Sequence, residues 1–174
     1  MATYHASITE EQAELIRSAP MFVVASADPN LARGPHDVGP VNVSVKGGVP
    51  LHILGPNRVV YLDYKGSGNE TARHCAAGGP VTVMISSFEG GDAATVRLFG
   101  RATVKPVAES PHGALLLAHA AQELKSARQA IEIEIDNTMT SCGYGVPVMQ
   151  FVRERRVADR GRRYKETAPA TPVA

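Results

Sequence analysis

The sequence lacks most of the features that would assign it to a specialised class of protein. Its 174 residues include two cysteines, Cys75 and Cys142, which are too few for a disulfide framework and fit no zinc-binding spacing. No stretch approaches the ~20 consecutive apolar residues of a membrane-spanning helix. The N-terminus has neither the positive charge nor the apolar run of a secretory signal. These absences predict a soluble, cytoplasmic protein with reduced thiols and no membrane partner.

A strong charge of one sign is also missing. The net charge of +1 gives no global attraction to nucleic acid or to anionic membranes. Arginine is concentrated between residues 153 and 165, but acidic residues interrupt the run, so a solvated tail is favoured over a nucleic-acid site. We therefore predict one domain over residues 1–152, followed by a basic, partly disordered tail over residues 153–174, and no nucleic-acid partner.

Common catalytic and metal-binding motifs are absent as well. The six histidines show no His-x-x-x-His or His-x-His spacing, so no metal site is predicted. The sequence has no Gly-x-Ser-x-Gly nucleophile elbow and no P-loop, and Cys142 has no histidine partner that can be assigned from sequence. No catalytic residue is predicted.

The sequence does contain a series of short apolar and β-branched segments separated by turn-forming residues. These segments cover residues 21–27, 41–46, 58–63, 81–88, 95–104 and 130–135. Their close spacing predicts a mostly β fold, a six-stranded antiparallel barrel with peripheral helices. Helices are predicted after a capping box at residues 7–10, over residues 69–77 and over residues 113–128.

The segment from Val41 to Lys46 alternates strictly between apolar and polar residues. A strand with this pattern places its three valines on one face and Asn42, Ser44 and Lys46 on the other. We expect the valine face to lie in the core and the polar face to form a row of hydrogen-bond donors. An ordinary half-exposed strand of an antiparallel sheet is the alternative.

A second candidate site follows the segment 58–63. Residues 64–71 read Tyr-Lys-Gly-Ser-Gly-Asn-Glu-Thr, a glycine-bearing turn that leads into a helix. Backbone N–H groups, the helix dipole and the hydroxyls of Ser67 and Thr71 give this turn the outline of a phosphate site. Capping of the helix by Asn69 explains the same residues equally well.

Taken together, five ordered segments resemble the FMN-binding split-barrel superfamily of pyridoxamine 5′-phosphate oxidase, and especially its oxidase-related FMN-binding branch. The resemblance covers about residues 20–152, and its carriers are residues 39–47, 60–72, 81–84, 96–102 and 140–147. It implies a six-stranded split β-barrel that binds FMN at the interface of a homodimer and acts on a small-molecule substrate.

The resemblance also implies which residues hold the cofactor. Ser44 and Lys46 are placed near the flavin, the residues of the turn near its phosphate, and Arg97 is a further cation for that phosphate. The predicted cofactor-binding set is Asn42, Ser44, Lys46, Tyr64, Ser67, Gly68, Asn69, Thr71 and Arg97.

This sequence departs from the vitamin oxidases at three points. Those enzymes carry Arg-Lys directly after the turn serine, where this chain has Gly68 and Asn69, and an arginine where Val41 stands. Their C-terminal Arg-x-His substrate segment has no counterpart in residues 144–150. The predicted function is therefore an FMN-dependent oxidoreductase for another small molecule. The alternatives are a non-catalytic flavin- or haem-binding module and an F420-dependent reductase.

Overall fold

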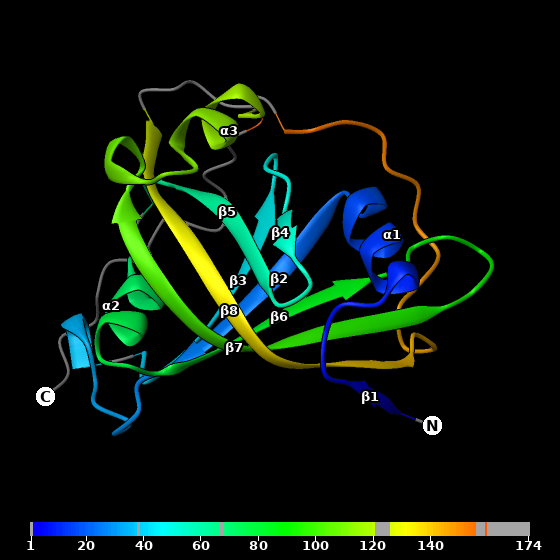
Figure 1. The fold of residues 1–174 in the computed structure, drawn as a ribbon, viewed down its shortest axis with the longest axis horizontal. Coiled ribbons are helices and arrows are strands. Elements are labelled where there is room, and N and C mark those ends of the chain that lie inside the picture. Colours follow the sequence, from blue (N-terminus) through cyan, green and yellow to red (C-terminus); the bar gives the residue numbers. More distant parts are fainter. Residues whose placement is uncertain (1, 38, 67, 121–125, 156–158, 160–174) are drawn as a thin grey trace, which may run out of the picture.

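The computed structural model describes residues 2–37, 39–66, 68–120, 126–155 and 159 (Figure 1). The strands are β1 (Thr3–His5), β2 (Met21–Ala27), β3 (Val41–Gly47), β4 (His52–Gly55), β5 (Arg58–Tyr64), β6 (Pro80–Ser86), β7 (Ala94–Pro106) and β8 (Ala127–Cys142). The α-helices are α1 (Glu10–Ser18), α2 (Glu70–Ala76) and α3 (Gly113–Ala118), with 3-10 turns at Pro35–Asp37 and Val107–Glu109. None of the helices in these ranges is long and apolar enough to cross a lipid bilayer.

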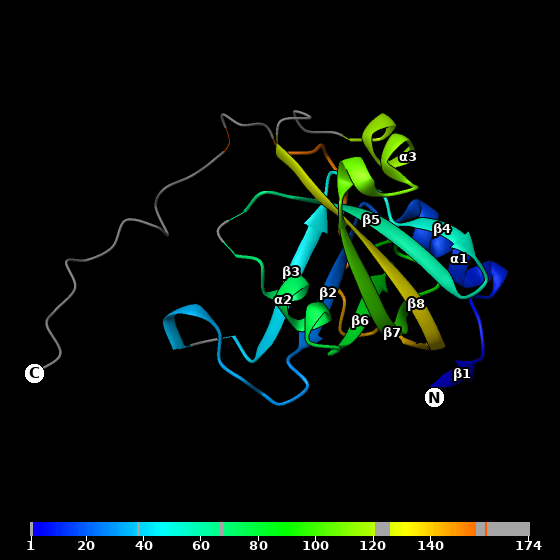
Figure 2. The same cartoon turned by 60° about the vertical axis from the view of Figure 1, so that its left-hand side comes forward.

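The strands form one antiparallel sheet that coils into an open barrel. Its order is β3-β2-β6-β7-β8-β5-β4, and β1 pairs with β8 outside this path. In the described part of the sheet β3 and β5 are not paired with each other, although the coiling brings them to face one another across the opening (Figure 2). The helix α2 packs at one end of this opening, against β2, β6 and β7.

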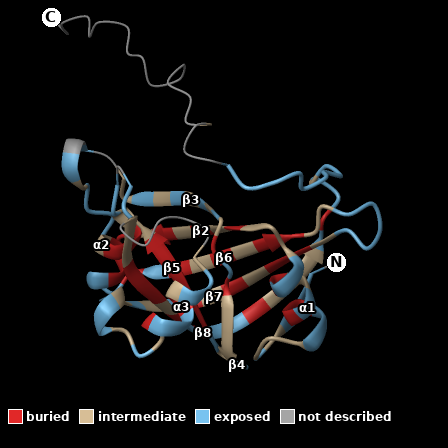
Figure 3. Cartoon of the chain, turned by 90° about the horizontal axis from the view of Figure 1, so that it is seen from above, coloured by how far each residue is buried: buried red, intermediate tan, exposed pale blue. Residues whose placement is uncertain are grey.

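The core lies inside the coiled sheet. Its fully buried residues come mostly from β2, β5, β6, β7 and β8, and α3 adds Leu116. They include Val24, Val59, Val83, Leu98, Ile131 and Ile133. Burial of each such side chain contributes roughly 1.5–3 kcal/mol to folding. Figure 3 shows β3 at the rim of this arrangement, in the colours of exposed and intermediate residues.

Two bulges shape the long strand β8. Against β7 the register shifts between Phe99 and Gly100, where a Cβ would overlap the carbonyl oxygen of Glu134, so this approach requires glycine. Against β5 the ladder pairs Asp63 with Gln129 but Tyr64 with Ala127. Arg128 is therefore an extra residue in β8 at this point.

The predicted fold class, a mostly antiparallel split barrel, is confirmed, but the sheet has eight strands where six are predicted. The additional β1 and β4 span only three and four residues, too short to show a clear alternation. The helix predicted over residues 113–128 ends at Ala118, and its last two residues begin β8. The first helix is capped by Thr9, whose hydroxyl accepts a hydrogen bond from the Gln12 backbone at 3.3 Å, and Ser7 is not the cap.

The expectation that the valine face of residues 41–46 lies in the core is wrong. Val41, Val43 and Val45 are 59%, 67% and 64% exposed. The ladder explains this, because Ser44 pairs with the core residue Val24 and Lys46 with the core residue Phe22. Directly paired side chains share a face of the sheet, so the polar residues of β3 point inward.

Candidate functional site

A polar cleft of about 510 Å³ lies between β3 and β5, at the end of the barrel where α2 begins. Residues from three parts of the chain line it. They are Asn42, Ser44, Val45 and Lys46 from β3, Asp63, Tyr64, Gly66, Gly68, Asn69, Glu70 and Thr71 from β5 to α2, and Arg128 from β8. The cleft thus occupies the split of the barrel, where the described parts of β3 and β5 are not paired with each other.

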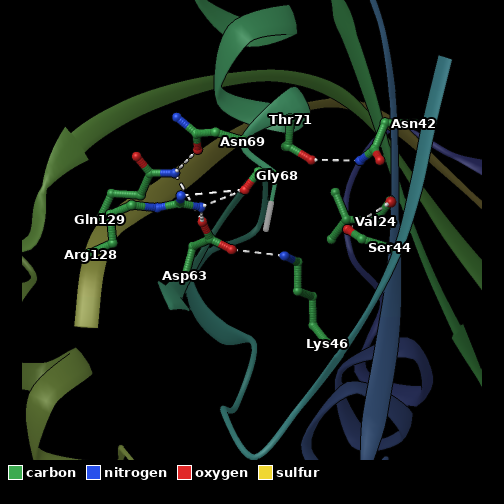
Figure 4. Close-up of polar contacts among 10 residues, drawn as sticks. All are labelled: Val24, Asn42, Ser44, Lys46, Asp63, Gly68, Asn69, Thr71, Arg128 and Gln129. Carbon is green, nitrogen blue, oxygen red and sulfur yellow. Dashed lines mark hydrogen bonds and ion pairs between the residues drawn. The ribbon is translucent and has the colours of Figure 1, made fainter. Parts of the chain in front are cut away.

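The polar row of β3 forms one wall of the cleft. The Asn42 side-chain amide donates a hydrogen bond to the Thr71 hydroxyl at 3.1 Å, which ties β3 to α2 (Figure 4). The Ser44 hydroxyl lies 3.5 Å from the Val24 carbonyl oxygen, a long contact that leaves it able to bind another group. The row therefore presents an amide, a hydroxyl and, at its end, the ammonium of Lys46.

The carboxylate of Asp63 is the centre of the opposite wall. Its side chain is only 7% exposed, and it accepts hydrogen bonds from Lys46 at 2.8 Å and from Arg128 at 2.6 Å (Figure 4). Gln129 donates a third at 2.9 Å, and the same amide nitrogen donates to the Asn69 side chain at 2.9 Å. One buried carboxylate therefore connects β3, β5, β8 and the turn before α2.

The charge state of Asp63 follows from these contacts. Burial raises the pKa of Asp63, but hydrogen bonds from Arg128 and Lys46, together with the Lys46 charge, outweigh burial and hold that pKa below the ordinary value of 3.8. Asp63 is thus an anion at neutral pH. It orders the two cations and is a poor source of protons for a reaction.

Tyr61 lies behind this wall, in the barrel interior. Its ring is fully buried, packs edge-on against Phe22 and lies 5.7 Å from the Lys46 nitrogen. Burial raises the pKa of Tyr61 well above its ordinary value of 10.0, so the phenol stays neutral. The ammonium of Lys46 therefore has a cation–π contact with Tyr61 as well as its ion pair with Asp63.

The structure brings most of the predicted cofactor-binding residues together. The cleft is lined by Asn42, Ser44, Lys46, Tyr64, Gly68, Asn69 and Thr71. Asn69 stands at the N-cap position of α2, but its side chain accepts from Gln129 and makes no capping hydrogen bond. Ser67 lies outside the described residues. Their role in binding a cofactor remains a prediction.

Arg97 is not brought to the cleft of its own chain. The ladders pair Val45 with Val23, Val23 with Met84, and Met84 with Arg97. Directly paired residues share a face, so Arg97 lies on the outer face of the sheet with the valines of β3. Its guanidinium donates to the Ser141 hydroxyl at 3.0 Å. The sequence could not reveal this, because strand pairing decides the face.

Sequence reasoning missed three charged residues of the cleft, Asp63, Glu70 and Arg128. Asp63 ends an otherwise apolar run, and a charge in a buried strand is a signal that could have been used. Arg128 gave no such signal, because its direction depends on the bulge between β5 and β8. The residues that order the site are therefore partly hidden from sequence.

No protein-family model matches the sequence. The chain is 31% identical over 154 residues to a pyridoxamine 5′-phosphate oxidase family protein of Aspergillus flavus, an alignment that covers 87% of this chain and 58% of the relative. The chain therefore spans a little over half the length of that relative.

Three solved structures share the fold. A candidate pyridoxamine 5′-phosphate oxidase of Lactobacillus delbrueckii matches with a TM-score of 0.55 at 20% identity, over 77% of this chain and 94% of that one. An FMN-binding protein of Syntrophomonas wolfei matches at 0.54 and 12% identity, over 75% and 86%. The haem storage protein HutZ of Vibrio cholerae matches at 0.51 and 13% identity, over 79% and 98%. These similarities show the split-barrel fold.

Proposed function

The chain belongs to the pyridoxamine 5′-phosphate oxidase-related family, and from that premise we propose that it is an FMN-dependent oxidoreductase acting on a small organic molecule. The observation that carries the proposal is the cleft in the split of the barrel. There the polar row of β3 faces the turn before α2 across a space lined by seven of the nine predicted residues.

The donors of the cleft fit a flavin phosphate. An anionic phosphate is bound best by hydroxyls, amides and cations, and the cleft offers all three through Ser44, Thr71, Asn42, Lys46 and Arg128. The buried Nε of Arg128 has no hydrogen-bond partner among the described residues, so a donor remains unused. FMN, when bound, would supply hydride or two-electron transfer. The residues of the chain would bind and orient it.

The lining of the cleft favours a flavin over haem. Haem iron is held in proteins by histidine, cysteine, methionine or tyrosine. Among the described lining residues only Tyr64 is of these types. A haem-binding module therefore has less support than a flavin protein, although HutZ has a similar fold. An F420-dependent reductase is the alternative that the same donors would serve.

We further propose that the protein works as a homodimer with the cofactor at the interface. The valines of β3 form an apolar stripe on the outer face, all three more than half exposed. Exposed apolar stripes of this kind are typical of interaction sites. With only 5% aromatic residues, one chain has few rings with which to enclose a tricyclic cofactor. Arg97 lies on this same face and would meet the second copy.

Pyridoxamine 5′-phosphate oxidation itself is not part of the proposal, because Gly68 and Asn69 stand where those enzymes carry Arg-Lys. The substrate is therefore a different small molecule. The proposal places the protein in the cytoplasm, where Cys75 and Cys142 would stay reduced, and both thiols are unpaired in the structure.

The test is reconstitution followed by reduction. Purified protein is titrated with FMN, haem and F420, and absorption spectra are recorded for each. We expect tight binding of FMN and bleaching of the bound flavin by a nicotinamide donor without oxygen. Binding of FMN without reduction by any donor would support the non-catalytic module, and binding of haem or F420 alone would overturn the FMN proposal.

A further inference from the structure

The bulge in β8 turns two consecutive side chains toward the same atom. In a regular strand neighbouring side chains point to opposite faces of the sheet. Here Arg128 Nη2 lies 2.6 Å and Gln129 Nε2 lies 2.9 Å from the same Asp63 oxygen, Oδ2 (Figure 4). This is possible because Arg128 is the extra residue of the ladder. Bulges occur next to functional sites, where they redirect a side chain.

Arg128 and Lys46 meet the Asp63 carboxylate from two different strands. Lys46 contacts Oδ1 from β3, and Arg128 contacts Oδ2 from β8. An ammonium has three N–H donors and a guanidinium has five, so each cation keeps donors that the carboxylate does not use. A second carboxylate, Glu70, also lines the cleft, so its four charged side chains sum to zero. The unused N–H donors of Lys46 and Arg128, and not a net charge, are what an anionic phosphate would contact.

We propose that Arg128 is a second phosphate-binding residue beside Lys46, and that Asp63 is the residue that positions both cations. This inference rests on the proposed function, because the phosphate is that of the flavin. Long cationic side chains lose considerable rotamer freedom when they bind a ligand. Asp63 imposes that order beforehand, from a carboxylate that is itself fixed by Gln129.

A purely structural role for these contacts is the competing explanation. The same ion pairs would then only close the barrel between β3, β5 and β8. The two roles differ in one measurable ratio, the affinity for FMN divided by the affinity for riboflavin, which lacks the phosphate. A structural defect weakens both ligands together, whereas the loss of a phosphate contact weakens FMN alone.

The first experiment compares Arg128→Gln with Arg58→Gln in titrations of the full chain with FMN and with riboflavin. Arg58 is a matched control, since it lies on β5 and pairs with Glu132 at 3.4 Å, outside the cleft. We expect Arg128→Gln to weaken FMN binding by about tenfold or more, with riboflavin little changed. Arg128→Lys should restore part of the FMN affinity. The control should bind both ligands as the wild type does.

The second experiment tests the positioning role with Asp63→Asn. This change makes the cleft more positive, yet we expect the preference for FMN over riboflavin to fall, because Lys46 and Arg128 lose their common partner. An increased preference for FMN would show that Asp63 merely neutralises the cations, and would overturn its positioning role.

The outcomes separate this inference from the proposed function. A wild-type chain with no preference for FMN over riboflavin would remove the phosphate site and both proposals that use it. A different result would overturn the role of Arg128 alone. In that case the wild type prefers FMN over riboflavin, Lys46→Met loses this preference, and Arg128→Gln keeps it.

Discussion

The two faces of β3 come from alternating residues of one seven-residue strand, yet they differ in burial and in partners. On the inner face, Asn42 and Lys46 bond to groups from α2 and β5. On the outer face Val41, Val43 and Val45 are more than half exposed. Polar residues face the interior here because β3 borders the split of the barrel, where hydrogen-bond partners and not apolar side chains lie opposite. At an open edge of a sheet, hydropathy alone does not tell inside from outside.

The outer face also continues beyond β3. Val45 pairs with Val23, and Val23 with Met84, so apolar side chains extend across β2 to β6 on the same face. The inner face instead ends in the buried ion cluster of Asp63. We interpret the first face as an assembly surface and the second as a ligand surface. The following changes test that division.

The largest effect is expected from Val43→Asp at the centre of the valine stripe. In a homodimer built on this face, two carboxylates would be buried without partners, at an effective cost of several kcal/mol per ion. Light scattering should show a monomer where the wild type is a dimer. Leu31→Asp is the control, because Leu31 is 64% exposed in the loop after β2 and is not part of the stripe. A dimeric Val43→Asp variant would remove this face as the interface.

Asp63→Ala should have the next largest effect, on the stability of the fold. It leaves Lys46 and Arg128 without their shared anion, and removal of one partner from a buried ion pair costs about 3–5 kcal/mol. Urea denaturation measures the loss. Asp37→Ala should change stability little, since its pair with Arg33 is exposed. Equal losses in the two variants would contradict the importance of burial at Asp63.

Acid should reduce the contribution of Asp63 to the stability of the fold. Because the folded-state pKa of Asp63 lies below its ordinary value of 3.8, its stabilisation is complete above that pH and is lost as pH falls through the folded pKa. The difference in unfolding free energy between the wild type and Asp63→Ala should therefore shrink below pH 3.8. Urea titrations across this range measure it, and a difference that stays constant would show that the ion pairs do not carry the effect.

Lys46→Met should weaken FMN binding by about 1.5–3 kcal/mol, because the charge is deleted while most of the apolar stem remains. The midpoint potential of the bound flavin should also fall if the ammonium stabilises the reduced anion. Calorimetry and a redox titration measure the two effects. Lys105→Met is the control on the exposed end of β7. Wild-type affinity and potential in Lys46→Met would leave Lys46 with a structural role only, as the ion-pair partner of Asp63.

Asn42→Ala should show the smallest effect. It removes the 3.1 Å hydrogen bond to Thr71, and a neutral hydrogen bond of this kind contributes about 1 kcal/mol to stability. Val41→Ala, on the opposite face of the same strand, should leave the stability of the subunit nearly unchanged. A larger loss in Val41→Ala than in Asn42→Ala would reverse the assignment of the two faces.

The sequence predicted the fold class because turn residues and alternation are local signals. It could not predict which face of Val41 to Lys46 is inside, since period two separates two faces without orienting them. The position of β3 at the sheet edge decides that, and it is a property of the whole ladder.

The same limit applies to the site. The polar residues of β3 and the turn could be found, because their chemistry and spacing are visible in the sequence. Arg128 could not, as it was placed in a helix that in fact ends ten residues earlier, at Ala118. Its direction is set by a bulge that exists only once β5 and β8 pair.

The strict alternation of β3 also limits how this protein can change in length. Its ladder with β2 runs without interruption from Met21 opposite Gly47 to Ala27 opposite Val41. A single residue inserted between Val43 and Ser44 would turn every position on one side of the insertion to the opposite face of the sheet. The connection from residue 28 to residue 40 is free of this constraint, because added residues there can loop out. In directed evolution, insertions should therefore be tolerated before β3 and eliminated within it.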